Sequence, residues 1–112
     1  MKKLYIFEVY TVKPDKLDET TTLAKNLVIM MKEHPEKFRE VKSFISYQQY
    51  IGVMGGFYDI WEVESFADFE KIMEKFAIDK ELKAIADGYY SVIVPGTFHL
   101  EICVDVDHYK PK

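Results

Sequence analysis

The chain has 112 residues, of which 48% are hydrophobic and 30% charged, so it has the size and composition of one ordinary globular domain. Its 15 basic and 19 acidic residues give a net charge of −4, which argues against nucleic-acid binding, because that binding needs concentrated positive charge. The single cysteine, Cys103, excludes an internal disulfide and is typical of the cytoplasm. No apolar run approaches the roughly 20 residues that cross a bilayer, so we expect a soluble protein with no membrane partner.

The first predicted strand, residues 4–12, is rich in aromatic and β-branched side chains and ends before Lys13-Pro14. Side chains alternate along a strand, so one side of it carries Leu4, Ile6, Glu8 and Tyr10. The other side carries Tyr5, Phe7, Val9 and Thr11. Both sides are largely apolar, and the helices of a small domain can cover only one of them. The simplest cover for the other side is a second copy of the sheet, which predicts a homodimer.

Helical and extended periodicities then alternate along the chain. Asp15 is predicted as the N-cap of a helix whose apolar stripe runs to Met31. A short helix is predicted over residues 35–41, because proline is favoured in a first helical turn. Strands are predicted at residues 43–51 and 57–63, separated by a glycine-containing turn.

The last third of the chain contains the most ambiguous stretch. Ser65 begins a capping-box-like motif and predicts the start of a helix. Residues 79–93 are predicted as another helix, although their C-terminal part also fits a strand in a hairpin across Pro95-Gly96. The final strand, residues 97–106, has one apolar face and one mixed face that carries His99, Glu101 and Cys103.

The resulting order, β-α-β-β-α-β, predicts a single ferredoxin-like α+β domain over residues 1–112 with a four-stranded antiparallel sheet. The segment Tyr10-Thr11-Val12-Lys13-Pro14-Asp15-Lys16-Leu17-Asp18-Glu19 resembles the opening of the NIPSNAP-like branch of the dimeric α/β-barrel superfamily. Further agreement lies in Val41-Lys42-Ser43-Phe44, Gly52, Trp61-Glu62-Val63-Glu64-Ser65-Phe66-Ala67-Asp68 and Val94-Pro95-Gly96-Thr97. The resemblance implies that two domains pair as a dimeric α/β barrel.

Glu8 is a candidate functional residue, because it interrupts an apolar strand between Ile6 and Tyr10. A buried carboxylate costs several kcal/mol unless it is paired or protonated. We expect Glu8 either to find a structural partner across the dimer or to transfer a proton or anchor a ligand in the barrel lumen. The resembling family usually has an arginine at this position of its first strand.

His99 and Glu101 form a second candidate pair, because two residues apart on a strand they share a face at about 7 Å. Histidine changes charge near neutral pH, so His99 is expected to be a general base that Glu101 orients. Both are expected to line the same lumen as Glu8, Tyr10 and Tyr47. The alternative is that both residues line a polar dimer seam or face water.

Tyr10, Tyr47 and Trp61 are expected to wall a ligand in the lumen, because apolar ligand pockets combine aromatic walls with a few polar groups. The alternative is an aromatic dimer core without a cavity. Strand register decides whether Asp59 and Trp61 or Tyr58 and Glu62 face this lumen.

No metal and no cofactor are expected. His99 and Cys103 lie on one strand face, but about 13 Å apart, which is too far for one zinc ion. Related barrels house cofactor-free monooxygenases, isomerases and haem-degrading enzymes. The resemblance therefore implies a cytoplasmic homodimer that binds or transforms a small apolar or aromatic molecule, in the manner of a cofactor-free monooxygenase or isomerase. The alternative is a noncatalytic small-molecule-binding or stress-associated homodimer.

Overall fold

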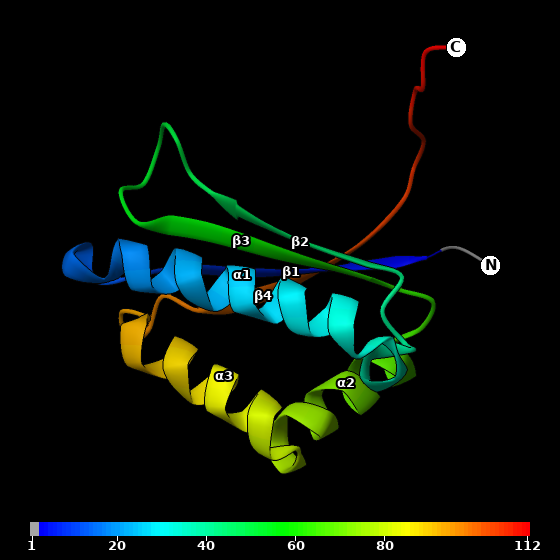
Figure 1. Ribbon diagram of the computed structural model, residues 1–112. Coiled ribbons are helices and arrows are strands. Elements are labelled where there is room, and N and C mark those ends of the chain that lie inside the picture. The colour runs from blue at the N-terminus through cyan, green and yellow to red at the C-terminus, as the bar shows by residue number, and fades with distance from the viewer. Residues whose placement is uncertain (1–2) are drawn as a thin grey trace.

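The computed structural model describes residues 3–112 and contains one antiparallel sheet with helices on one of its faces (Figure 1). Its strands lie in the order β2-β3-β1-β4, with bounds β1 Leu4–Thr11, β2 Ser43–Gln48, β3 Gly56–Val63 and β4 His99–Val104. This is the ferredoxin-like arrangement, so the predicted fold class is confirmed. The described helices include none long and apolar enough to cross a membrane.

Three α-helices connect the strands, together with two short 3-10 turns at Pro14–Lys16 and Pro35–Phe38. They are α1 Leu17–Glu33, α2 Phe66–Ile78 and α3 Lys80–Val92. The second crossover therefore contains two helices, α2 and α3. Ser65 caps α2 as predicted, because its hydroxyl accepts a hydrogen bond from the Asp68 N–H at 3.1 Å.

Several predicted bounds need correction. Asp15 lies inside the first 3-10 turn and does not cap α1, whose N-cap is Lys16 without a side-chain hydrogen bond. The helix predicted over residues 79–93 is confirmed, and Asp79 caps it by accepting from two backbone N–H groups. The alternative hairpin is wrong, because α3 continues to Val92 and residues 89–92 are therefore helical rather than extended.

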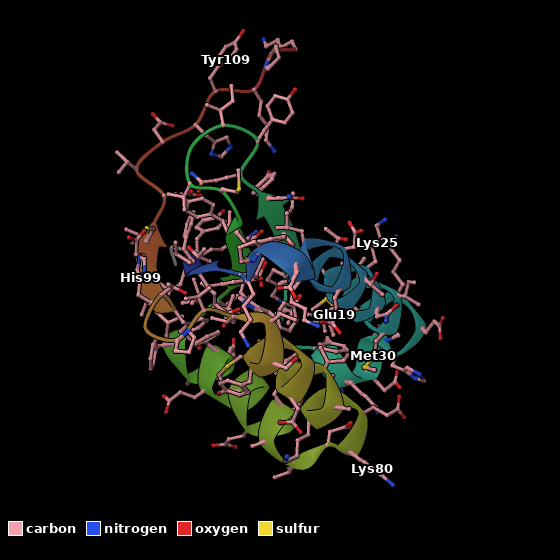
Figure 2. All side chains as sticks on the ribbon, turned by 90° about the vertical axis from the view of Figure 1, so that its left-hand side faces the viewer. Glu19, Lys25, Met30, Lys80, His99 and Tyr109 are labelled. Atoms are coloured by element: carbon pink, nitrogen blue, oxygen red, sulfur yellow. The ribbon has the colours of Figure 1, made fainter. Side chains whose placement is uncertain are left out.

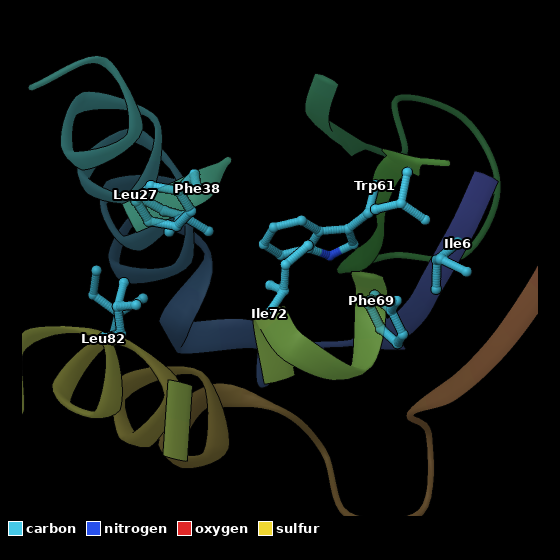
Figure 3. Packing of buried hydrophobic residues seen from close by; sticks show 9 residues of the cluster. Ile6, Leu27, Phe38, Trp61, Phe69, Ile72 and Leu82 are labelled. Carbon is cyan, nitrogen blue, oxygen red and sulfur yellow. The ribbon is translucent and has the colours of Figure 1, made fainter. Parts of the chain in front are cut away.

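The core lies between the sheet and the helices (Figure 3). Trp61 of β3 packs against Phe44 of β2 and Phe76 of α2, with ring centroids 4.6 and 5.9 Å apart. The other buried members of this cluster are Ile6, Leu27, Phe38, Val63, Phe69, Ile72, Leu82 and Ile85. This cluster fills the space between the helices and the two central strands, β1 and β3.

The strand register assigns each side chain to one of two faces. Ile6 pairs with Trp61 and Tyr10 with Phe57, all four buried, so this alternation faces the helices. The opposite face, called the open face below, has no helix over it in Figure 1. It includes Tyr5, Phe7, Val9, Ser43, Ile45, Tyr47, Tyr58, Ile60, Glu62, His99, Glu101 and Cys103.

The edge strand β4 is exposed over its whole length, because the helices lie mainly over the strands beside it. Its helix-side residues Leu100, Ile102 and Val104 pair with Glu8, Ile6 and Leu4 of β1. These three β4 side chains are 46–48% exposed. They form an apolar shelf at the edge of the covered face.

Candidate functional site

A row of polar side chains crosses the helix-covered face of the sheet. Ser46 on β2 pairs directly with Asp59 on β3, and Asp59 pairs directly with Glu8 on β1. Directly opposed residues of antiparallel strands point to the same side. The row therefore brings two carboxyl groups together inside a domain whose core is otherwise apolar.

Asp59 is held by hydrogen bonds to both of its carboxylate oxygens. The Ser46 hydroxyl donates to Oδ1 at 2.6 Å, and the Tyr10 hydroxyl donates to Oδ2 at 2.7 Å. Asp59 is only 4% exposed, and burial raises the pKa of its carboxyl while the two donors oppose that rise. The two hydroxyl groups thus take the place of a cationic partner.

Fewer hydrogen-bond donors stabilise the charged form of Glu8 than that of Asp59. The Trp61 indole Nε1–H donates to its Oε1 at 2.5 Å. Burial raises the pKa of Glu8 to about 7; the Trp61 hydrogen bond opposes this rise and the nearby Asp59 charge adds to it. Glu8 therefore gains and loses its proton near neutral pH.

Tyr89 of α3 presents an unpartnered hydroxyl to the same region. Its ring lies edge-on to Tyr10 at 6.1 Å, and its hydroxyl is buried without a hydrogen-bond partner. Burial raises the pKa of both tyrosines, so both stay protonated at neutral pH. An unpartnered buried hydroxyl is rare in folded proteins.

Aromatic side chains flank the polar row on both sides. Tyr10 stacks between Phe57 and Phe98, at centroid distances of 5.7 and 6.2 Å. Trp61 with Phe44 forms the other flank, at 4.6 Å. A titratable carboxyl between aromatic walls is suited to proton transfer with an apolar molecule.

The polar row reaches solvent at the β4 edge of the sheet. The position after Glu8 in the row is Leu100, which is 46% exposed, and Glu8 itself is only partly buried. Phe98, at 45% exposure, continues the apolar shelf on one side of this position. A molecule resting on the shelf would meet the Glu8 carboxyl next.

The sequence-predicted site residues fall on two opposite faces, so the expectation of one shared lumen lining is wrong. Glu8, Tyr10 and Trp61 lie together on the helix-covered face. Tyr47, His99 and Glu101 lie on the open face. The register also places Asp59 and Trp61 toward the helices and Tyr58 and Glu62 on the open face.

His99 and Glu101 do contact each other on the open face of β4. The His99 Nε2 atom lies 3.4 Å from Glu101 Oε2, and both side chains are more than half exposed. Figure 2 shows His99 at the edge of the molecule. Their β1 neighbours are Val9 and Phe7, so this pair lies beside apolar groups and apart from the Glu8 row.

Sequence reasoning did not assign Asp59, Ser46 and Tyr89 to the Glu8 site. Asp59 carried a usable signal, because it interrupts the apolar strand 57–63 as Glu8 interrupts the first strand. Antiparallel pairing of these strands then brings the two interruptions opposite each other. Tyr89 carried no such signal, since it lies in the segment whose helical or extended character the sequence left open.

No protein-family model and no curated protein matches the sequence. Solved structures do match it. A NIPSNAP family protein from Agrobacterium tumefaciens superposes with a TM-score of 0.73 at 16% identity, covering 94% of each chain. The chain has the NIPSNAP fold. The resemblance inferred from the sequence is thereby confirmed at the level of the fold.

Two further structures extend this comparison of the NIPSNAP fold. An uncharacterised NIPSNAP-like domain protein from Burkholderia xenovorans has a TM-score of 0.71 at 14% identity, covering 97% of this chain and 90% of that one. A protein from Caulobacter crescentus that carries the provisional name of an antibiotic-biosynthesis monooxygenase has a TM-score of 0.73 at 12% identity, covering 95% and 92%.

An open hollow of about 380 Å³ lies elsewhere on this NIPSNAP fold, where α2 meets α3. Its two lysines are already engaged: Lys37 lies 3.0 Å from Asp79, and Lys75 lies 2.7 Å from Glu40. These ion pairs leave neither lysine free to anchor an anionic ligand in the hollow. Within residues 3–112, no three histidine, cysteine or acidic side chains group as metal ligands would.

Proposed function

We propose that this protein binds a small, neutral aromatic molecule on the β4 shelf and exchanges a proton with it through Glu8. The observation that carries the proposal is the Glu8 carboxyl, which titrates near neutrality between aromatic walls and faces the exposed end of the polar row. A general acid or base works best when its pKa lies near the operating pH.

The groups next to Glu8 orient its carboxyl and favour it as the group that exchanges a proton. Trp61 holds one oxygen by its indole N–H and so orients the carboxyl. Two hydroxyl donors, Tyr10 and Ser46, oppose the rise that burial causes in the pKa of Asp59. Glu8 has only the Trp61 donor, which favours Glu8 as the group that changes its protonation state. The unpartnered Tyr89 hydroxyl is available to donate to a substrate oxygen.

The proton-transfer step serves two kinds of cofactor-free chemistry. Glu8 takes a proton from an acidic C–H or O–H group, and the substrate keeps the electron pair as an enolate or phenolate. In an isomerase, Glu8 returns the proton to a different carbon. In an oxygenase, the substrate anion reduces dioxygen, so that a CH2 group becomes a carbonyl with one oxygen atom and the other oxygen atom leaves as water; the substrate supplies all four electrons. Both carboxylates would repel an anionic substrate, so the proposed substrate enters uncharged.

Hydrogen exchange in 2-tetralone, a neutral ketone fused to a benzene ring with an acidic C–H group between the two, tests the proposal. The wild-type protein should accelerate deuterium incorporation from D₂O at that carbon, and Glu8→Gln should abolish the acceleration. Glu101→Gln is the matched control, because it removes an exposed carboxylate from the open face and should leave the exchange unchanged. Equal exchange with wild type and Glu8→Gln would overturn the proposal.

A noncatalytic binding role is the second candidate, and the open face favours it. His99 and Glu101 there adjoin Phe7, and Tyr47 is 52% exposed. Binding of 2-tetralone that Tyr47→Ala weakens, without any acceleration of exchange, would support this candidate over the first.

We also propose that the protein is a cytoplasmic homodimer whose two open faces meet. The open face carries Tyr5, Phe7, Val9, Ile45, Tyr47, Tyr58 and Ile60, an apolar surface of the kind that soluble monomers seldom leave uncovered. Tyr47→Lys places a charge on this surface at an exposed position and should give a monomer in sedimentation equilibrium. A wild-type monomer at micromolar concentration would contradict the dimer.

A further inference from the structure

The connection between β2 and β3 is an unusually apolar surface segment. The tip loop, residues 49–55, exposes Tyr50 at 98%, Ile51 at 86%, Val53 at 58% and Met54 at 82%. No charged residue occurs between Lys42 and Asp59, in a chain that is 30% charged. Surface loops are normally polar, so a loop of this composition is typical of an interaction site.

Backbone hydrogen bonds hold the tip loop in a defined shape. The Gln49 N–H donates to the Gly56 carbonyl at 2.8 Å, and the Val12 N–H donates to the Gly55 carbonyl at 2.9 Å. Gly55 has φ 79°, and a Cβ there would lie 2.9 Å from the Val12 carbonyl oxygen, so the close approach of loop and β1 requires glycine. These hydrogen bonds and the close packing at Gly55 thus fix the backbone that carries the four exposed apolar side chains.

The tip loop rises from the sheet on the side opposite α2 and α3, which is the side of the open face (Figure 1). The C-terminal segment, residues 105–112, leaves the sheet on the same side but at the other end of the strands. Its apolar residues are also exposed, Val106 at 95% and Tyr109 at 85%. Figure 2 shows Tyr109 well beyond the body of the domain. A body seated on the open face would be flanked by both projections.

We infer that the tip loop is a dimerisation arm: its apolar side chains pack against a second copy of this chain when the two open faces meet. This inference rests on the proposed dimer and adds the segment that secures it. A fully exposed tyrosine offers on the order of 200 Å², and the four side chains together offer roughly half of the ~800 Å² that each partner of a standard interface buries.

Charge favours a second copy over a membrane surface as the occupant. The chain carries a net charge of −4, and anionic lipid headgroups repel an acidic protein. Two copies that meet through the tip loop bring no like charges together at that loop, because residues 43–58 contain no charged side chain. The loop also lies on the same side as the surface that itself needs a cover.

Sedimentation equilibrium of paired variants tests the inference. Tyr50→Ser/Met54→Ser removes apolar area from the arm and, because both side chains are exposed, should not alter the folded monomer. Its dimer dissociation constant should rise by about tenfold or more. The matched control is Tyr90→Ser/Ile78→Ser, whose residues are 80% and 83% exposed on the helices and should leave dimerisation unchanged.

The outcomes separate the arm from the dimer. A monomeric wild type overturns both. A dimer that Tyr47→Lys dissociates but Tyr50→Ser/Met54→Ser does not weaken leaves the open-face dimer standing and overturns the arm. Binding of the wild type to anionic vesicles in place of self-association overturns the choice of occupant.

Cross-linking gives a second, position-specific readout. A photoreactive thiol reagent on Ile51→Cys, in a Cys103→Ser background, should join the arm to the other copy. Mixing ¹⁵N-labelled with unlabelled chains distinguishes a link between copies from a link within one copy. Links found only within one copy would overturn the inference.

Discussion

The indole N–H of Trp61 donates a hydrogen bond to the Glu8 carboxyl at 2.5 Å, across the two central strands of the sheet. Trp61 is the only tryptophan of the chain and belongs to the main hydrophobic cluster. This contact therefore connects the titratable group of the candidate site to the hydrophobic core. Changes at Glu8 should be visible both in stability and in the signals of Trp61.

The stability of the protein should fall as the pH rises through about 7. The folded-state pKa of Glu8 is about 7 and its ordinary value is 4.5, so the folded state binds the proton more tightly than the unfolded state. The stabilisation is full below the ordinary pKa and is lost as the pH rises through the folded one, by up to roughly 3 kcal/mol.

Glu8→Gln keeps the shape of the side chain and removes its titratable carboxyl group, so most of this pH dependence of stability should disappear. Urea unfolding at about pH 5 and about pH 8 measures it, and the variant should exceed the wild type in stability at the higher pH. Asp59, whose pKa is also raised, should leave a smaller residual slope of the same sign in the variant. An unchanged slope would show that Glu8 does not titrate in this range.

Tyr10→Phe should destabilise the protein, because it removes one of the two hydroxyl donors to the buried Asp59. A lost hydrogen bond to a buried charged group costs about 1–3 kcal/mol. Chemical unfolding at alkaline pH, where Asp59 is ionised, should show the full loss. A variant as stable as the wild type there would mean that Ser46 alone satisfies the carboxylate.

Tyr89→Phe should have the opposite effect on stability, because its hydroxyl is buried without a partner. Removing it should leave the unfolding free energy within about 0.5 kcal/mol of the wild type or raise it slightly. The same variant should weaken 2-tetralone binding if that hydroxyl meets the ligand oxygen. A clear destabilisation would instead reveal a structural hydrogen bond.

The sequence predicted the order and type of the elements because their periodicities are strong. Ser65 signalled the start of α2, and the helical spacing of residues 79–93 outweighed the extended character of their C-terminal part. Strand ends were less predictable. The apolar residues 49–51 have strand-like composition, yet the backbone turns after Gln48 to form the tip loop.

The sheet face on which Glu8 lies could not be predicted, because the first strand is apolar on both sides. Alternation alone separates Glu8 and Tyr10 from Tyr5 and Phe7 but does not say which set meets the helices. That choice depends on the partner strand, where Asp59 and Trp61 turn out to be buried. The grouping of Glu8 with Tyr47, His99 and Glu101 failed for this reason.

The most direct test of the account is a pH titration of the Trp61 indole N–H resonance, which is the only indole signal of the protein. Because this N–H donates to Glu8, its chemical shift should follow the charge of the carboxyl. We predict a transition with a midpoint near pH 7 that is absent in Glu8→Gln. A midpoint near the ordinary glutamate pKa of 4.5, or the same transition in Glu8→Gln, would contradict it.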